Sequence, residues 1–332
     1  MMTLGNFSKL NYLFLILVFF SCNSNNKIKI NGYTMGTTYE VTIDSFHGDS
    51  SVLKDNIDKI LLDINNIFST YLIDSEISFI NNFKENKNIK ISEEFHEVLS
   101  RSLYYCDLSA GSYDITVGPL VELWGFGKNK VQIIPSEEDI KETLNYIGYE
   151  NILSDDSFLR KNIKTLNIDF NSIAKGYAVD KVYDLLKKNS YNNFLVEIGG
   201  ELRSSSTDEY SWTVGIADPT SNNIINKIKL DNFSMATSGT YNNYFVYNEE
   251  VYSHIINPLT GYPYQHELVS ATIITEKCID ADALATMAFT MNVDEFLNIV
   301  NSLENTECYL VSVNEENNLI FKESDNFLNF ID

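Results

Sequence analysis

The stretch Ile168-Asp169-Phe170-Asn171-Ser172-Ile173-Ala174-Lys175-Gly176-Tyr177 joins a predicted strand, 166–170, to a predicted helix that runs from 173 to about 188. A second short strand is predicted at 194–198. This is one strand–helix–strand unit, and a doubly wound protein repeats such a unit along its chain. The sequence on either side therefore decides the fold class.

The flanking sequence does not repeat the unit. Residues 28–43 predict two strands joined by a turn at Met35-Gly36, and 52–68 carries apolar residues at helical spacing. Residues 212–274 are mostly strand-like, with turns at Asp218-Pro219, Ser238-Gly239 and 258–263. Further elements are predicted as helices at 281–291 and 294–303 and as a closing hairpin at 307–313 and 318–321. This irregular mixture predicts an α+β fold with largely antiparallel strands.

Two more helices are predicted from their start signals. Ser92 and Ser136 are each followed by acidic residues, which is typical of an N-cap and a first helical turn. Between the first predicted helix and Ser92, the Asn- and Lys-rich residues 81–90 predict a surface loop.

Length and charge limit the classes of function. At about 150 residues per domain, 332 residues fit two domains or one large unit. Lys and Arg number 24 against 46 Asp and Glu, which gives a net charge of −22. This balance argues against binding to nucleic acid, because a phosphate backbone needs a basic surface. It does not exclude one small anionic ligand that a metal ion and backbone amides neutralise locally.

The N-terminal residues predict an export signal. Lys9 is the only charge before position 27, and a mostly apolar run, 10–20, follows it. Ser21-Cys22 and a polar stretch come next, a pattern that resembles a bacterial lipobox. We therefore expect residues 1–21 to be a lipoprotein signal peptide and 22–332 the mature domain, possibly in two lobes, with a lipid on Cys22. The alternative is an uncleaved N-terminal anchor, and either case predicts the cell envelope, on the periplasmic side of the inner membrane.

The remaining cysteines and the motif scan exclude common chemistries. Cys106, Cys278 and Cys308 are widely spaced and odd in number, which predicts buried free thiols rather than disulfides or a zinc site. The sequence contains no GxxxxGK[ST], HExxH, GxSxG or EF-hand motif.

Several residues could still carry chemistry. Asp282 and Thr286 are four apart on a predicted helix, so their oxygens share a face and could hold Mg²⁺, although Asp282 could equally cap its own helix. Lys175 at a helix start could meet an anion or be solvated. His254, at a strand end, could be a general base or structural.

Aromatic residues on glycine-rich loops leave two interpretations open. Gly111-Ser112-Tyr113-Asp114 and Trp124-Gly125-Phe126-Gly127 lie on either side of Pro119. Such side chains could hold a flat ring system, or they could pack in the core.

Taken together, the sequence resembles the ApbE family, the FAD:protein FMN transferases. Nine blocks occur in the family's order between residues 34 and 286: 34–39, 68–76, 113–120, 124–127, 169–180, 197–201, 236–241, 254–263 and 281–286. The resemblance implies an ApbE-like, T-fold-like architecture. It departs from the family pattern at Asn257, where Asp is frequent, and at Asn242, where Arg is frequent.

The resemblance also implies roles for individual positions. Mg²⁺ would be held by Asp282, Thr286 and the main-chain oxygen of Ser172, and His254 would assist catalysis. The FAD contacts that it implies are Met35, Tyr71, Ser112, Tyr113, Asp114, Asp169, Lys175 and Ile256.

The implied activity is the Mg²⁺-dependent transfer of FMN from FAD to a threonine hydroxyl of a flavoprotein, with release of AMP. The implied acceptors are subunits of Rnf or Na⁺-translocating quinone reductase complexes, which a lipid-anchored enzyme would meet at the membrane. Two alternatives remain open: an FAD pyrophosphatase that makes FMN and AMP, and a non-catalytic FAD-binding lipoprotein.

Overall fold

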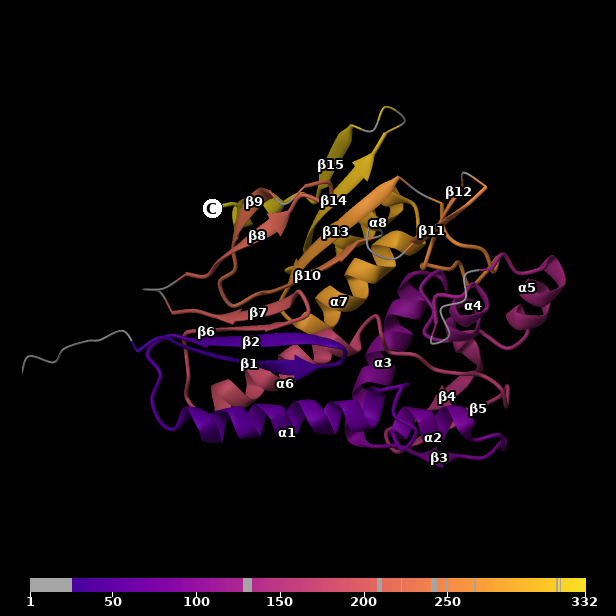
Figure 1. Cartoon of the computed structure of the whole chain (residues 1–332), viewed down its shortest axis with the longest axis horizontal. Helices are drawn as coiled ribbons and strands as arrows, with labels where there is room; N and C mark the ends of the chain where they lie inside the picture. The colour runs from indigo at the N-terminus through magenta and orange to yellow at the C-terminus, as the bar shows by residue number, and fades with distance from the viewer. Residues whose placement is uncertain are drawn as a thin grey trace, which may run out of the picture.

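The computed structural model describes residues 26–127, 133–207, 211–221, 223–239, 244–248, 250–265, 267–314, 316 and 318–332. Its largest element is an eight-stranded sheet in the order β1-β2-β6-β7-β10-β13-β14-β15, with antiparallel pairing between all neighbouring strands (Figure 1). The strands of this sheet are β1 (Ile28–Thr34), β2 (Thr37–Ile43), β6 (Phe194–Ile198), β7 (Glu201–Ser205), β10 (Ser234–Gly239), β13 (Leu268–Thr275), β14 (Glu307–Val313) and β15 (Leu319–Glu323). The antiparallel α+β class predicted from the sequence is confirmed.

Helices pack along this sheet, with α1 and α6 next to β1, β6 and β7, and α7 next to β10 and β13 (Figure 1). The helices of the structure are α1 (Ser50–Phe68), α2 (Glu76–Asn82), α3 (Glu93–Leu108), α4 (Gly118–Leu123), α5 (Glu137–Leu144), α6 (Ala174–Lys188), α7 (Cys278–Met287) and α8 (Val293–Ser302). Short 3-10 turns are η1 (Tyr149–Asn151), η2 (Ala288–Thr290) and η3 (Phe327–Phe330).

Smaller sheets complete the fold. The hairpin of β8 (Thr213–Ala217) and β9 (Ile224–Lys229) shares an apolar cluster with β10, β13 and β14. A second hairpin pairs β11 (Tyr244–Tyr247) with β12 (Glu250–Ser253), and a three-stranded sheet joins β3 (Ile89–Lys90), β5 (Phe158–Lys161) and β4 (Ile152–Ser154). The β11–β12 hairpin packs with α4 and α5 in a satellite core beside the main one.

Local sequence signals explain the first elements. Thr34 and Thr37 are register partners, so Met35 and Gly36 form a two-residue hairpin turn, with φ of 50° and 75°. Positive φ at both positions suits the right-handed twist of the flanking strands. The predicted hairpin is confirmed, and Met35 lies at its tip.

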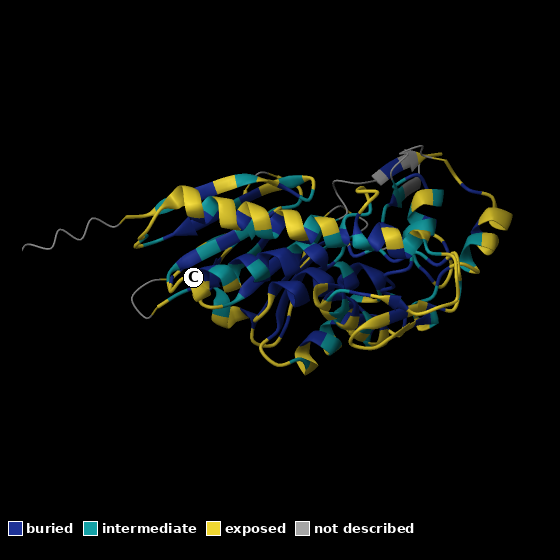
Figure 2. Ribbon diagram, turned by 90° about the horizontal axis from the view of Figure 1, so that it is seen from below, coloured by how far each residue is buried: buried dark blue, intermediate teal, exposed yellow. Residues whose placement is uncertain are grey.

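Helix starts also follow the sequence. Ser92 Oγ accepts a hydrogen bond from Phe95 N at 3.2 Å, and Ser136 Oγ accepts one from Asp139 N at 3.1 Å. Both predicted N-caps are confirmed. Helix α1 buries one stripe against the core and leaves its outer face exposed (Figure 2).

Four predicted elements differ from the structure. The turn predicted at Ser238-Gly239 is wrong, because both residues belong to β10. Residues 166–170 are not a strand, because among the described residues no strand pairs with them. Asn81 pairs with both N and O of Ile168, and Asp169 N donates to Ile115 O. The predicted loop 81–90 is shorter, since its ends belong to α2 and β3. The helix predicted at 281–291 starts earlier, at Cys278, and its last turn is 3-10.

Other predictions concern the cysteines and the N-terminus. Cys106, Cys278 and Cys308 are buried and free, as predicted. Among the helices of the described residues, none has the length and apolar character to span a bilayer. Residues 1–21 and Cys22 lie outside the described residues, so the signal and the lipid anchor stay predictions.

Candidate active site

A cavity of about 350 Å³ opens between the satellite core and the main core. Loop 112–118, segment 169–172, the chain after β12 and the end of α7 supply its walls. The predicted site residues that line it are Tyr71, Ser112, Tyr113, Asp114, Asp169, Ser172, His254, Ile256 and Thr286. Segments far apart in the sequence therefore meet where the family resemblance places a flavin site.

Two further cavities adjoin the first. One, of about 560 Å³, is lined by Met35 and Lys175; the other, of about 580 Å³, is lined by Asp169. Tyr71 and Asn171 line all three, and Tyr71 is 70% exposed at the junction. Because the three cavities share these two lining residues, they are described together as the ligand groove.

Asp282 lies behind the groove, 3% exposed, on α7. Its Oδ2 accepts a hydrogen bond from Gly176 N at 2.9 Å, and its Oδ1 lies 4.0 Å from Lys175 Nζ. Asp282 therefore does not cap its own helix, whose N-cap is Lys277. It meets the amino end of α6 instead, where the helix dipole favours a negative charge.

Lys175 reaches between two buried carboxylates. It donates to Glu201 Oε1, and its side chain is 30% exposed, so the alternative of a solvated lysine is wrong. Burial alone would lower the pKa of Lys175, but the charges of Asp282 and Glu201 outweigh burial and raise it. The ammonium is therefore charged at neutral pH.

The pKa values of the two acids are raised as well. Burial raises the pKa of Asp282, against the lowering effects of Lys175 and the Gly176 amide. Burial, and then the negative charge of Asp282, also raise the pKa of Glu201, against the lowering effect of Lys175. Two buried acids thus share one lysine, and the raised pKa values are those expected for acids that are buried close together.

Loop 112–118 is held by its own polar side chains. Asp114 accepts hydrogen bonds from Thr116 N at 2.7 Å and from Tyr149 N at 3.0 Å, so both of its oxygens organise the loop. Tyr113 Oη lies 2.7 Å from Ser172 Oγ, and Ser112 Oγ lies 3.2 Å from Thr290 Oγ1. These contacts tie the loop to segment 169–172 and to η2.

The segment before α6 is positioned from α2. Asn81 Nδ2 donates to Ile168 O at 2.8 Å, and Asp169 N donates to Ile115 O at 2.8 Å. Asp169 Oδ1 in turn accepts from Asn171 N at 2.7 Å. Asp169 therefore presents a carboxylate at the groove on a backbone that is fixed at both neighbours.

One residue of the aromatic blocks packs in the core, and another lines the cavity. Trp124 is 1% exposed, donates to Gly261 O at 2.8 Å and stacks on Tyr252, which places it in the core. Phe126 lines the cavity and meets His254 edge-to-face, with 6.3 Å between ring centroids. The cavity wall therefore contains an aromatic side chain beside the predicted base.

Of the two departures from the family pattern, Asn257 lies within the described residues. Asn257 Oδ1 accepts from Leu259 N at 2.8 Å and from Thr260 N at 3.2 Å. An amide oxygen thus makes the turn contacts that a carboxylate could make, and they need no negative charge. Asn242 lies outside the described residues.

The donor set fits Mg²⁺. Asp282 and Thr286 lie one turn apart on α7, and Ser172 and Thr286 both line the same cavity. Mg²⁺ uses few protein ligands, prefers oxygen and keeps water or phosphate in its other positions. Within the described ranges no group of three or more His, Cys, Asp or Glu forms a cage, and a site of one carboxylate, one hydroxyl and one carbonyl does not require one.

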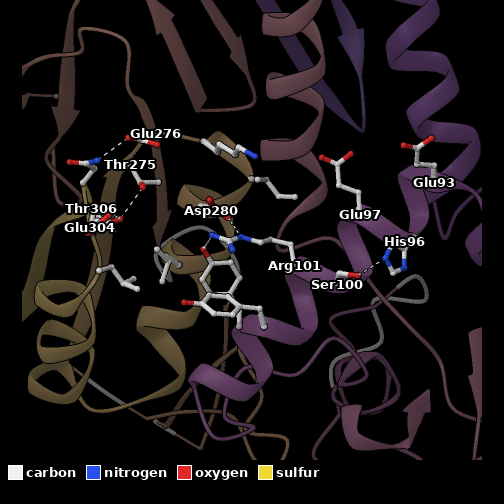
Figure 3. Close-up of a pocket in the computed structure, with 17 residues that line it drawn as sticks. Glu93, His96, Glu97, Ser100, Arg101, Thr275, Glu276, Asp280, Glu304 and Thr306 are labelled. Carbon is white, nitrogen blue, oxygen red and sulfur yellow. Dashed lines mark hydrogen bonds and ion pairs between the residues drawn. The ribbon is translucent and has the colours of Figure 1, made fainter. Parts of the chain in front are cut away.

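A larger cavity, of about 790 Å³, lies elsewhere, between α3, α7 and the start of β14 (Figure 3). Arg101 and Asp280 pair across it, and none of the predicted site residues lines it. Asp280 and Asp282 are two apart on α7, so they point to opposite sides of the helix. The larger cavity is therefore separate from the candidate active site.

Sequence reasoning missed the roles of Glu201 and Asn171. Glu201 belongs to one of the nine blocks, and the available signal was an acidic residue directly after Gly199-Gly200 at the start of a strand. Asn171 lies in the stretch that joins the predicted strand to the helix, and only the cavities reveal that it faces the ligand groove.

Comparison with solved structures defines the class of protein. The fold superposes on a flavin transferase ApbE from Vibrio cholerae with a TM-score of 0.84 and 31% identity, covering 92% of this chain and 99% of the other. It also superposes on the flavinyl transferase ApbE of Pseudomonas stutzeri, with a TM-score of 0.81, 29% identity and coverage of 93% and 98%. The fold is that of the flavin transferases.

Sequence comparison gives the family. A model of the ApbE family matches residues 35–310. The FAD:protein FMN transferase of Vibrio cholerae is 36% identical over 272 residues, 80% of this chain and 81% of the relative; that of Haemophilus influenzae is 35% identical over 322 residues, 92% of each. The chain belongs to the ApbE family, and the predicted family and architecture are confirmed.

Proposed function

We propose that this protein is an enzyme that transfers FMN from FAD to a threonine hydroxyl of an acceptor protein and releases AMP. Family membership and relatives named FAD:protein FMN transferase support the transfer of FMN to a protein. The observation that carries the proposal is the buried Asp282, fixed by Gly176 N beside Lys175, behind a groove lined by the predicted FAD contacts.

The reaction balances as a phosphoryl transfer. The acceptor oxygen forms a bond to the phosphorus on the FMN side, and the bond from that phosphorus to the bridging oxygen breaks, so that oxygen leaves with AMP. His254 lies on the cavity wall and is assigned to accept the hydroxyl proton.

The chain's own groups hold and orient the pyrophosphate. Mg²⁺ would be held by Asp282, Thr286 and the main-chain oxygen of Ser172; when bound, it neutralises charge on the phosphate oxygens. Lys175 adds a positive charge next to Asp282, and Asp169 and Tyr71 lie along the groove where the rest of FAD would lie.

The acceptor and location are part of the proposal. We infer that the acceptors are membrane flavoprotein subunits such as those of Rnf or Na⁺-translocating quinone reductase complexes, and that a lipid on Cys22 keeps the enzyme near them. The lipobox-like pattern and the family resemblance support this inference.

One experiment separates the proposal from its alternatives. The protein is incubated with FAD, Mg²⁺ and a candidate acceptor, the acceptor is weighed by mass spectrometry, and AMP is assayed. A transferase adds FMN to the acceptor and releases AMP. An FAD pyrophosphatase releases free FMN and AMP without modifying the acceptor, and a non-catalytic FAD-binding protein releases no AMP.

A further inference from the structure

Glu201 is a buried acid that the proposed reaction does not use. It opens β7 directly after Gly199 and Gly200, and it is 3% exposed. Its Oε1 accepts from Lys175 Nζ, whereas its Oε2 is buried without a hydrogen-bond partner among the described residues. A carboxylate oxygen left unpaired in the interior is costly, because it loses its hydrogen bonds to water and gains none in the protein. A residue kept at such a cost requires a reason.

The charges around Lys175 indicate that reason. Its ammonium forms a hydrogen bond with Glu201 but lies 4.0 Å from Asp282 Oδ1, beyond hydrogen-bond distance. Among the described residues it is the one Lys, Arg or His that forms an ion pair with either acid. One ammonium therefore serves two buried carboxylates and is drawn to Glu201.

We propose that Glu201 is a positioning residue that holds the Lys175 ammonium off Asp282 and so leaves Asp282 Oδ1 available to a divalent cation. The inference rests on the proposed function in one respect, the binding of that cation at Asp282. Glu201 itself is not assigned as a metal ligand.

The Lys175 ammonium and a cation would compete for a single oxygen, Asp282 Oδ1. A buried ammonium that lost its partner would gain most by moving onto the nearest carboxylate, because an unpaired charge in the interior is costly. For Lys175 that carboxylate is Asp282. A contact ion pair there would occupy the oxygen that a cation needs, so the strong pair with Glu201 protects the site.

The backbone makes the arrangement rigid. Asp282 Oδ2 is held by Gly176 N at 2.9 Å, so the carboxylate cannot turn away from Lys175 without losing this hydrogen bond. Lys175 and Gly176 are adjacent in the first turn of α6, and α6 packs on α7. The side chain of Lys175 is therefore the part that is free to change partner.

The test measures metal binding without turnover. Mn²⁺ replaces Mg²⁺ as the probe, and free Mn²⁺ is followed by electron paramagnetic resonance on FAD-loaded protein without acceptor. Glu201→Gln removes the charge but keeps the shape, and Glu201→Asp keeps the charge but is one methylene too short to hold Lys175 in place. Both are expected to raise the Kd for Mn²⁺ about 10- to 100-fold, the usual effect of losing a partner that orients a metal ligand.

A Lys175→Met background tests whether Glu201 acts through the lysine. In Lys175→Met protein there is no ammonium to move, so adding Glu201→Gln or Glu201→Asp is expected to change the Kd for Mn²⁺ less than about twofold. Glu97→Gln is the matched control. Glu97 pairs at 3.0 Å with Lys181, which lies on α6 as Lys175 does, and Glu97 lines the separate cavity of Figure 3. It removes one charge and should leave the Kd unchanged. Far-UV circular dichroism and the unfolding midpoint report whether each variant is folded.

Two results would overturn the inference. If Glu201→Asp binds Mn²⁺ as wild type does, the charge at position 201 is sufficient for metal binding and Glu201 does not need to position Lys175. If Glu201→Gln still weakens Mn²⁺ binding in the Lys175→Met background, Glu201 does not act through the lysine. Asp282→Asn tests the underlying assumption: equal Mn²⁺ binding by this variant and wild type would remove both the metal assignment and the inference. If the expected Kd changes occur but no acceptor gains FMN, the proposed function fails and the inference stands.

Discussion

Asp282 and Thr286 share one face of α7 but differ in charge. Asp282 is the ionisable side chain among the three proposed ligands, since the Thr286 hydroxyl and the Ser172 main-chain oxygen are neutral. Its burial makes that difference large, because a charge interacts more strongly with a cation in a site of low dielectric constant. The two positions should therefore respond differently to substitution.

Asp282→Ala is expected to abolish Mg²⁺-dependent release of AMP while the protein stays folded and still binds FAD. A loss of about 10³-fold or more is expected when the charge stabilisation of a phosphoryl transfer is removed. Raising Mg²⁺ should restore Thr286→Ala far better than Asp282→Ala, and AMP release across a Mg²⁺ titration measures both. Near wild-type transfer by folded Asp282→Ala at low Mg²⁺ would show that the metal site is wrongly placed.

Tyr71 is the exposed aromatic residue that lines all three adjoining cavities. Tyr71→Ala is expected to weaken FAD binding by ~1–3 kcal/mol, the value of a lost aromatic contact with a flat ring. Fluorescence titration with FAD gives the dissociation constant. Tyr33→Ala is the matched control: Tyr33 is 88% exposed on β1 and lines none of the cavities described above. Equal constants for Tyr71→Ala and wild type would remove Tyr71 from the site.

At the scale of elements, the contact between α6 and α7 sets the position of Asp282. A Cβ on Gly176 would overlap the carbonyl oxygen of Cys278 and lie 2.8 Å from Asp282 Cβ. Glycine is thus the residue that lets the two helices approach closely enough for the Gly176 N–H to reach Asp282.

Gly176→Ala is expected to destabilise the protein by about 1–3 kcal/mol, the usual cost of overpacking. The sign is informative, because alanine in a helix normally stabilises by about 1 kcal/mol relative to glycine. Urea unfolding gives the free energy, and Mn²⁺ binding should weaken in parallel because the helices are pushed apart. Gly118→Ala, where the new Cβ would meet only Asp169 Cβ at 3.9 Å, is the control for stability. A more stable Gly176→Ala protein would contradict the proposed close packing.

A buried lysine connects β5 to α2 and to the segment before Asp169. Lys161 Nζ donates to Ile80 O at 2.8 Å and to Leu166 O at 3.0 Å, and the residue is 1% exposed. Burial, and then the charge of Lys84, lower the pKa of Lys161 to about 8, from 10.5. Between these two values the folded protein binds fewer protons than the unfolded chain, so this group makes stability rise with pH.

The expected contribution is at most about 1.4 kcal/mol per pH unit between pH 8 and 10.5, and it is absent below pH 8, where Lys161 is protonated in both states. Urea unfolding at several pH values compares wild type with Lys161→Met. The variant should lack this rise, although it is less stable throughout because three carbonyl oxygens, those of Ile80, Asn81 and Leu166, lose their donor. Parallel curves for the two proteins would show that Lys161 does not titrate in this range.

At the scale of the whole molecule, the net charge bears on the proposed attachment to a membrane. With a net charge of −22 it has no electrostatic attraction to anionic lipids, so its proposed attachment depends on the lipid at Cys22. Cys22→Ala is expected to release the protein from the membrane fraction or to block processing, as measured by fractionation and by the mass of the mature chain. Tight membrane association of a correctly cleaved Cys22→Ala protein would exclude the anchor.

The sequence by itself determined the family, the α+β class, the hairpin around Met35, the helix starts at Ser92 and Ser136 and nine of the residues that line the cavity of about 350 Å³. These depend on short-range signals, such as caps, turns and apolar periodicity, or on blocks kept in order along the chain. The tertiary structure alone decided that 166–170 is held by Asn81 rather than by a strand, and that Lys175 lies between Glu201 and Asp282. Those residues are 26 and 107 positions from Lys175, and the pairing of buried charges depends on packing between distant elements, which local patterns do not encode.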